Sequence, residues 1–397
     1  MVVFCYWTLS NETKAINYIL SKWRHKMKKY SLLIIIALLL CAMIAFAGCN
    51  SQQEPANTED SDTAADEVQT ILVGRPGLDI KIAAIIAAYQ TGYYEEEGVN
   101  VEFETISNLN DGVTAVSTQK LDVLPFGVIP SATFISQGTD VVIFGGTISE
   151  GSEGVTLPEN ADRFKSLDGF QGARLACYRM ETGHMVMKGL LREHGYNVGM
   201  LNEGADVEIV YMDSMASCTE AVQKGDVDIA MVNSGYGYVA QQAGLAVSFQ
   251  VGDFQANFPC CRQTTSRYAL ENKFDALVKF TIANLRGYEL LMTDKDAAIQ
   301  CLADYSGQDA AYVENVIYGT DGYDAAMIVS LDPSKNDVEK FYQVMKDNGD
   351  IDADTPYDIA DNIDTTVYQT ALETLIEREP DNKIWADLMT AFEAHNL

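Results

Sequence analysis

Two adjacent cysteines, an uncommon pair, precede an arginine at Cys260, Cys261 and Arg262, where the chain is expected to cross back between two lobes and so to border a cleft. Adjacent thiols can close into a strained vicinal disulfide, one of them can pair with Cys177, or both can stay buried as small apolar side chains. The cysteines after residue 49 are Cys177, Cys218, Cys260, Cys261 and Cys301. Their number is odd, so at least one thiol is expected to be unpaired or to engage a ligand. The sequence leaves all three alternatives open.

Three arginines fall in predicted loops or at a junction between lobes of a chain that is poor in basic groups: Arg75, Arg179 and Arg262. A guanidinium group binds sulfonate, carboxylate or phosphate with two parallel hydrogen bonds. These arginines are therefore candidate partners of an anionic ligand. The alternative for each is a solvated arginine that pairs with surface acids.

Aromatic residues near predicted strand ends could enclose a planar ligand. They are Phe126, Tyr178, Tyr236, Tyr238 and Phe258. Aromatic side chains at such positions also pack lobes together, and this alternative stays open. Glu181, Thr182 and His184 stand at the start of a predicted helix, where Thr182 could simply cap the helix.

No catalytic constellation is recognisable, and we expect neither an enzyme nor a cofactor. The histidines after residue 48 are His184, His194 and His395, and none has metal-ligand spacing, so no metal site is expected. The formal net charge of the whole chain is −30, and residues 49–397 carry 21 basic against 56 acidic side chains. Such an acidic surface excludes nucleic acid as a partner, because phosphate binding needs a basic footprint.

Strands and helices alternate through the first two thirds of the chain. Strands are expected at 70–73, 99–105, 123–126, 141–144, 174–178, 207–211, 228–232 and 246–249, and helices at 80–90, 112–119, 131–135, 183–194, 215–224 and 236–243. This order predicts α/β lobes with a parallel or mixed sheet covered by helices. After residues 258–262 helices dominate, at 273–291, 337–348, 367–376 and 384–394.

An export signal precedes these elements. Residues 32–47 are an uninterrupted apolar run of sixteen that follows Met27, Lys28 and Lys29. The run is shorter than the roughly 18 to 20 residues that a membrane-spanning helix needs, which favours a cleaved signal. Residues 46–49 resemble the lipobox of bacterial lipoproteins, although that pattern prefers Leu where Phe46 stands. We expect an exported protein held at the outer face of the cytoplasmic membrane by lipidated Cys49; the alternative is an ordinary signal peptide that ends near a cysteine.

These patterns predict seven parts. They are a mis-assigned upstream start (1–26), a lipoprotein signal (27–48), a flexible tether (49–68), the first part of lobe 1 (69–160), lobe 2 (161–258), a return to lobe 1 (259–330) and C-terminal helices that pack on lobe 1 (331–397).

Several short motifs, in their order and spacing, resemble the substrate-binding proteins of ABC importers that bind nitrate, sulfonates, taurine and thiamine-precursor pyrimidines. They are AAYQTGYYEEEGV at 87–99, QKLDV at 119–123, QG at 137–138, SLDGFQG at 166–172 and KGDVD at 224–228. The resemblance implies the type II periplasmic-binding-protein fold, with two α/β lobes, a central cleft and a helical C-terminal extension. The pyrimidine-synthase relatives carry a longer cysteine cluster for iron, whereas this chain has only the pair.

The resemblance also implies a function and its partners. The expected function is that of a monomeric solute receptor that delivers a small organic molecule, anionic or planar, to an ABC permease and its ATPase. The alternatives are an enzyme on the same fold that resembles a pyrimidine-precursor synthase, and a sensory binding module for a membrane receptor.

Ligands of open α/β sheets bind beyond the carboxyl ends of the strands, so loops 74–79, 126–131, 178–184 and 233–238 should border the cleft. The candidate ligand-binding residues are Arg75, Asp79, Phe126, Tyr178, Arg179, Glu181, Thr182, His184, Asn233, Ser234, Tyr236, Cys260, Cys261 and Arg262.

Overall fold

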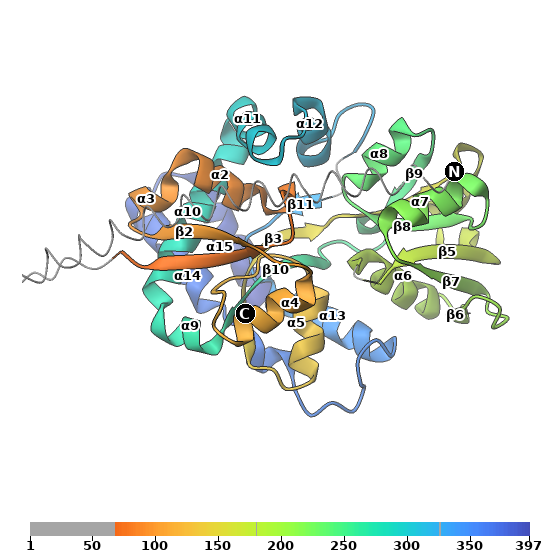
Figure 1. Ribbon diagram of the computed structural model, residues 1–397, viewed down its shortest axis with the longest axis horizontal. Helices are drawn as coiled ribbons and strands as arrows, with labels where there is room; N and C mark the ends of the chain where they lie inside the picture. The colour runs from red at the N-terminus through yellow and green to blue at the C-terminus, as the bar shows by residue number, and fades with distance from the viewer. Residues whose placement is uncertain (1–67, 180, 325–326) are drawn as a thin grey trace, which may run out of the picture. The chain divides into compact units, whose positions relative to one another are not determined.

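Three β-sheets carry the fold in the computed structural model, which describes residues 68–179, 181–324 and 327–397 (Figure 1). The strands are β1 (Thr70–Arg75), β2 (Asn100–Thr105), β3 (Val141–Glu150), β4 (Ser152–Thr156), β5 (Ala173–Tyr178), β6 (Val198–Met200), β7 (Val207–Met212), β8 (Ile229–Asn233), β9 (Ala246–Gln250), β10 (Pro259–Ser266) and β11 (Met327–Val329). The predicted upstream start, signal and lipidation site Cys49 lie outside the described residues, as does the tether except for its last residue.

The largest sheet has six strands in the order β6-β7-β5-β8-β4-β9. The strands β5, β6, β7 and β8 run parallel to one another, whereas β4 runs antiparallel to both β8 and β9. Alternate residues of β5 enter different apolar clusters: Leu175 and Cys177 join the larger cluster and Ala176 the smaller one. Because strand side chains alternate between faces, both faces of this sheet are covered.

Two smaller sheets build the other lobe. β1 and β2 are parallel, and β3 lies between the antiparallel strands β10 and β11. Single bridges, Val73 to Val123 and Leu124 to Thr264, connect the two sheets. The predicted strand at 123–126 is wrong in its length. Only Val123 and Leu124 pair with a strand, because Pro125 has no N–H to continue a ladder.

Strand β10 contradicts the prediction that helices dominate directly after residue 262. All eight of its residues are buried, and its sequence, PCCRQTTS, shows no alternation of apolar and polar side chains. Its polar groups are bonded inside the lobe: the Thr265 hydroxyl donates to the carbonyl oxygen of Asp122 at 2.7 Å, and the Gln263 amide donates to that of Gly146 at 2.7 Å. A strand buried on both faces has no period-2 signal to detect.

The helices are α2 (Ala83–Thr91), α3 (Tyr93–Glu96), α4 (Leu109–Ser117), α5 (Val128–Ser136), α6 (Thr182–Glu193), α7 (Met215–Lys224), α8 (Tyr236–Gln242), α9 (Arg267–Asn272), α10 (Phe274–Thr293), α11 (Lys295–Ser306), α12 (Ala310–Tyr318), α13 (Lys335–Asp347), α14 (Thr366–Arg378) and α15 (Lys383–Asn396), with short 3-10 turns that include η1 (Ile80–Ile82) and η5 (Val251–Asp253). In the described part of the chain, none of these helices combines the length and apolar character needed to cross a membrane.

The long helix α10 organises the helical layer of the smaller-sheet lobe, because it packs against both α2 and α14. A β-carbon added at Gly287 of α10 would lie 2.1 Å from the carbonyl oxygen of Ala84 in α2, so only glycine fits at this crossing. α14 also contacts β3, while α13 contacts α6. Asn348, at the end of α13, donates to the carbonyl oxygen of Met185 in α6 at 2.9 Å.

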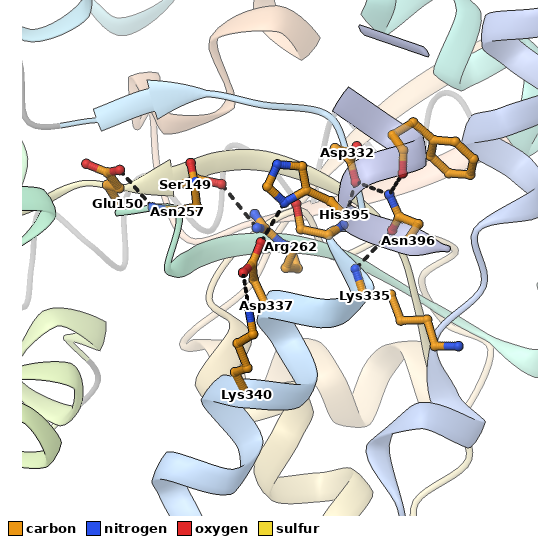
Figure 2. A network of polar contacts seen from close by, with 12 residues as sticks. Ser149, Glu150, Asn257, Arg262, Asp332, Lys335, Asp337, Lys340, His395 and Asn396 are labelled. Carbon is orange, nitrogen blue, oxygen red and sulfur yellow. Dashed lines mark hydrogen bonds and ion pairs between the residues drawn. The ribbon is translucent and has the colours of Figure 1, made fainter. Parts of the chain in front are cut away.

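The chain crosses between the lobes at two points that are bonded to each other. Glu150, the last residue of β3, and Gly151, which joins β3 to β4, both have positive φ angles, as does Asn257, which precedes β10. The Glu150 carboxylate accepts a hydrogen bond from the Asn257 amide at 2.9 Å (Figure 2), and the Glu150 amide donates to the carbonyl oxygen of Phe258 at 2.8 Å. The two crossing segments are therefore tied together.

Candidate functional site

A cavity of about 440 Å³ lies where the four predicted loops meet the two cysteines. Its wall consists of Pro76, Asp79, Lys81, Ser107, Asn108, Leu109, Asn110, Phe126, Gly127, Tyr178, Thr182, Asn233, Cys260 and Cys261. The residues before α5 come from one lobe. From the other, Tyr178 and Asn233 are the last residues of β5 and β8, and Thr182 is the first residue of α6. The structure thus brings together seven candidates, Asp79, Phe126, Tyr178, Thr182, Asn233, Cys260 and Cys261; their contact with a ligand stays a prediction.

Lys81 is the cationic side chain of this wall. Asp79 caps η1 by accepting a hydrogen bond from the Lys81 amide at 2.9 Å, and its carboxylate lies 3.8 Å from the Lys81 Nζ. Burial alone would lower the pKa of the amine, but the negative charge of Asp79, with smaller effects of Cys261 and Glu181, outweighs burial and raises it. Lys81 therefore presents an ammonium group to the cavity at neutral pH.

Helix beginnings provide further polar groups at the wall. Asn108 caps α4 and lines the cavity, as does Thr182, the first residue of α6. Behind the wall, Glu181 caps α6 by accepting bonds from the amides of Gly183 and His184, each at 2.7 Å. α5 begins after Gly127, and no side chain caps the first amides of this helix. An uncapped helix N-terminus favours a negative or strongly polar group.

Cys260 and Cys261 are thiols in the described structure, as are Cys177, Cys218 and Cys301. Their sulfurs lie 3.9 Å apart, which is too far for a disulfide bond. Neither is more than 5% exposed, and both face the cavity. The structure thus contains the third of the three alternatives, two buried thiols, but places them at a cavity wall.

The helix-start group is a capping structure with a buried histidine. Thr182 is the first residue of α6, so the expectation that it caps the helix is wrong; the longer side chain of Glu181 does so and also accepts a bond from Ser152. His184 is 1% exposed, its Nδ1 lies 2.5 Å from the carbonyl oxygen of Glu181, and burial lowers its pKa. Glu181 and His184 do not line the cavity.

The three candidate arginines do not line the cavity either. Arg75 stacks on Phe103 and Tyr305, with its guanidinium carbon 5.1 and 5.2 Å from the two ring centroids, and Arg179 lies 3.9 Å from the ring centroid of Tyr211. Arg262 is fully buried and binds backbone: it donates to the carbonyl oxygen of Ile148 at 2.9 Å.

Figure 2 shows the surroundings of Arg262, which also donates to the Ser149 hydroxyl at 3.1 Å. Asp332 lies in the same network and accepts a bond from Asn396 at 2.8 Å. Burial lowers the pKa of Arg262, against the opposing effect of Asp332. In this position the arginine fastens β10 to β3.

Ser234 and Tyr236 line a neighbouring cavity of about 260 Å³ that shares Asp79 and Lys81 with the first. The Ser234 hydroxyl is buried without a partner among the described residues. The aromatic candidates Tyr238 and Phe258 pack instead: Tyr238 lies edge-on against Tyr312 and Tyr323, and Phe258 is in the core. A third cavity, of about 350 Å³, lies beside β9 and residues 321–324 and contains none of the predicted residues.

Lys81 was missed by the reasoning from sequence. It stands in the apolar run 80–88, where one lysine reads as the solvated side chain of an amphipathic helix. The usable signal was Asp79, since an Asp before a helix start indicates a capped turn that fixes the direction of the next side chains.

The fold is that of solved solute-binding proteins. The periplasmic aliphatic sulphonate binding protein SsuA from Escherichia coli matches with a TM-score of 0.58 at 16% identity, over 75% of this chain and 92% of its own. The periplasmic nitrate-binding protein NrtA from Synechocystis PCC 6803 matches with a TM-score of 0.60 at 13% identity, over 78% of this chain and 89% of its own. The predicted α/β type II periplasmic-binding-protein fold is thereby confirmed.

The same fold also occurs in an enzyme: the desulfurization enzyme DSZB matches with a TM-score of 0.56 at 14% identity, over 77% of this chain and 99% of its own. No curated protein sequence matches the chain. The model of the NMT1/THI5-like family matches residues 79–298, more than half of the chain. The chain belongs to the NMT1/THI5-like family.

Proposed function

We propose that the protein is the solute-binding component of an ABC importer and holds a small organic ligand in the 440 Å³ cavity. The observation that carries this proposal is the composition of the wall, which comes from both lobes and joins one ammonium group, an uncapped helix start and two aromatic rings. The two solved binding proteins described above, one for sulphonate and one for nitrate, support this class of function.

The ligand is proposed to be an organic anion such as a sulfonate, or a planar heteroaromatic molecule such as a thiamine-precursor pyrimidine. Lys81 and the first amides of α5 would meet its negative or polar group, and Phe126 and Tyr178 its apolar or planar part. Asn233 offers an amide from the opposite lobe. Because residues of both lobes line one cavity, a ligand there would favour the closed arrangement of the lobes.

The location and partners belong to the same proposal. The protein would be exported, held at the outer face of the cytoplasmic membrane by lipidated Cys49, and would deliver its ligand as a monomer to a permease and its ATPase. Metabolic labelling with a fatty acid tests the anchor: the wild-type chain should take up the label, and the Cys49→Ala variant should not.

Native mass spectrometry of the purified protein, followed by denaturation and identification of the released compound, tests the main proposal. One unmodified organic molecule per chain is the expected result. An empty protein that instead converts a candidate substrate would favour an enzyme on this fold. The similarity to DSZB and the thiols at the cavity support that alternative.

Lys81→Met tests the ligand class. Truncating a buried charged partner of a ligand costs about 2 to 5 kcal/mol, so the affinity for an alkyl or aryl sulfonate should fall at least about tenfold in calorimetric titration. Lys120→Met, at an exposed position, is the matched control and should bind like wild type. Equal affinity of the Lys81 variant, with an unchanged melting temperature, would refute a role for this ammonium group in binding.

A further inference from the structure

Cys260 and Cys261 lie side by side on one wall although they are neighbours in a strand. Successive side chains of a regular strand point to opposite faces. Here the pairing of β10 with β3 shifts register between Pro259 and Cys261 and again between Cys261 and Arg262. Such a bulge re-aims side chains, and both sulfurs face the same cavity, 3.9 Å apart.

The two thiols have different surroundings. The two sulfurs lie 3.9 Å apart, where either thiol can donate to the other. The hydrogen bond with Cys260, the positive charge of Lys81 and the backbone amide of Gly127 lower the pKa of Cys261 to about 7, although burial acts in the other direction. Donation to Cys261, together with burial, raises the pKa of Cys260 well above its usual value. A thiol with the lower pKa is the more readily ionised of the two, so Cys261 is the candidate nucleophile and Cys260 the candidate resolving thiol.

We propose that Cys261 and Cys260 form a reactive dithiol that exchanges with low-molecular-weight disulfides entering the cavity and closes to a vicinal disulfide. The Cys261 thiolate attacks one sulfur of the disulfide RSSR, so that a Cys261–S–S–R bond forms and RS⁻ leaves. Cys260 then loses its proton to solvent and attacks the Cys261 sulfur, and a second RS⁻ leaves. The pair is oxidised by two electrons, and RSSR is reduced to two thiols.

The geometry of the pair suits the second step. The sulfurs must approach from 3.9 Å to about 2.05 Å, the length of a disulfide bond. At the bulge the backbone of β10 already departs from regular pairing, so the adjustment need not break a regular ladder. Both side chains already point to the same side. This inference does not depend on which solute the cavity binds.

Treatment of the full-length protein with 2-hydroxyethyl disulfide at pH 7, followed by alkylation and peptide mapping, tests the proposal. In wild type, the peptide that contains Cys260 and Cys261 should become two hydrogens lighter, without an adduct. Cys260→Ser should accumulate a mixed disulfide on Cys261, because the resolving thiol is absent. Cys261→Ser should show neither product at this peptide.

Cys301 is an internal reference in the same sample. Cys301 is more exposed than Cys261, yet burial and Asp304 raise its pKa, so it should react at least about tenfold more slowly. Equal rates at Cys301 and Cys261 would overturn the proposal. If a variant fails to fold, the pH dependence of the exchange rate in wild type tests the proposal. The rate should level off above about pH 7. A rate that still rises through pH 9 would contradict the assignment of Cys261 as the attacking thiol.

Discussion

Glu153 should make the protein less stable as the pH rises from 5 to 8. This residue of β4 is fully buried; its carboxylate accepts hydrogen bonds from the Tyr323 hydroxyl at 2.5 Å and from the Gly237 amide at 2.9 Å. Burial outweighs these two bonds and raises the pKa of Glu153 from 4.5 to about 8. A carboxyl group whose pKa is raised by folding takes up a proton when the chain folds.

The sign and size of the effect follow from linkage. Below pH 4.5 both states carry the proton, and the group has no effect on the pH dependence of stability. Between pH 4.5 and 8 the folded state keeps a proton that the unfolded state has released, so the free energy of unfolding falls by about 1.4 kcal/mol per pH unit. Over the whole window the loss is on the order of 5 kcal/mol.

Urea unfolding at pH 5, 6, 7 and 8 of wild type and of Glu153→Gln measures this term. The neutral amide should cost about 1 kcal/mol at pH 5, where it fits the two donors less well, and should be the more stable form at pH 8. Glu220→Gln is the control, because Lys224 lowers the pKa of this exposed group and it stays ionised throughout. Parallel stability curves for wild type and Glu153→Gln between pH 6 and 8 would refute the reasoning.

Two further substitutions test packing and anchoring. Gly287→Ala should lower the free energy of unfolding by about 2 to 3 kcal/mol, because the new methyl group would meet the Ala84 carbonyl. Gly189→Ala is the control: its methyl group meets only the Val344 side chain, at 3.2 Å, and should change the free energy by less than about 1 kcal/mol. Comparable effects of the two substitutions in urea unfolding would contradict the close approach at Gly287. Arg262→Met should lower the free energy of unfolding by about 3 kcal/mol, because it leaves the Ile148 carbonyl and its neighbours without this donor. The affinity for a sulfonate should fall less than tenfold. The opposite pattern, unchanged stability and lost binding, would make Arg262 a ligand contact.

Much of the fold was predictable because its signals are local. The alternation at 99–105 indicates a half-buried strand, and β2 occupies Asn100–Thr105. The apolar residues after Asp228 indicate the strand expected at 228–232, and β8 occupies Ile229–Asn233. The sheet membership of β4, which pairs with β8 and β9, favours a first lobe crossing near Gly151; the predicted boundaries of the parts stay predictions.

The side chains of the site were harder to predict than the loops that present them. The order of strands and helices predicts where loops gather, and residues from all four predicted loops line the cavity. The direction of a side chain depends on caps and bulges that have no periodic signal. Lys81 reaches the cavity through the turn capped by Asp79, and Cys260 does so through a bulge. Arg262, two residues after Cys260, instead points into the lobe.

The arrangement of the strands along the chain has a consequence for folding. The six-stranded sheet is built from one continuous stretch, 152–250, whereas the three-stranded sheet joins β3 to β10 and β11, more than a hundred residues downstream of it. Contacts between distant residues form late, because the closure of a long loop costs entropy first. During synthesis, the lobe of the six-stranded sheet can therefore become ordered while β3 still lacks both partners. Until residue 329 has emerged, this apolar strand needs protection from aggregation.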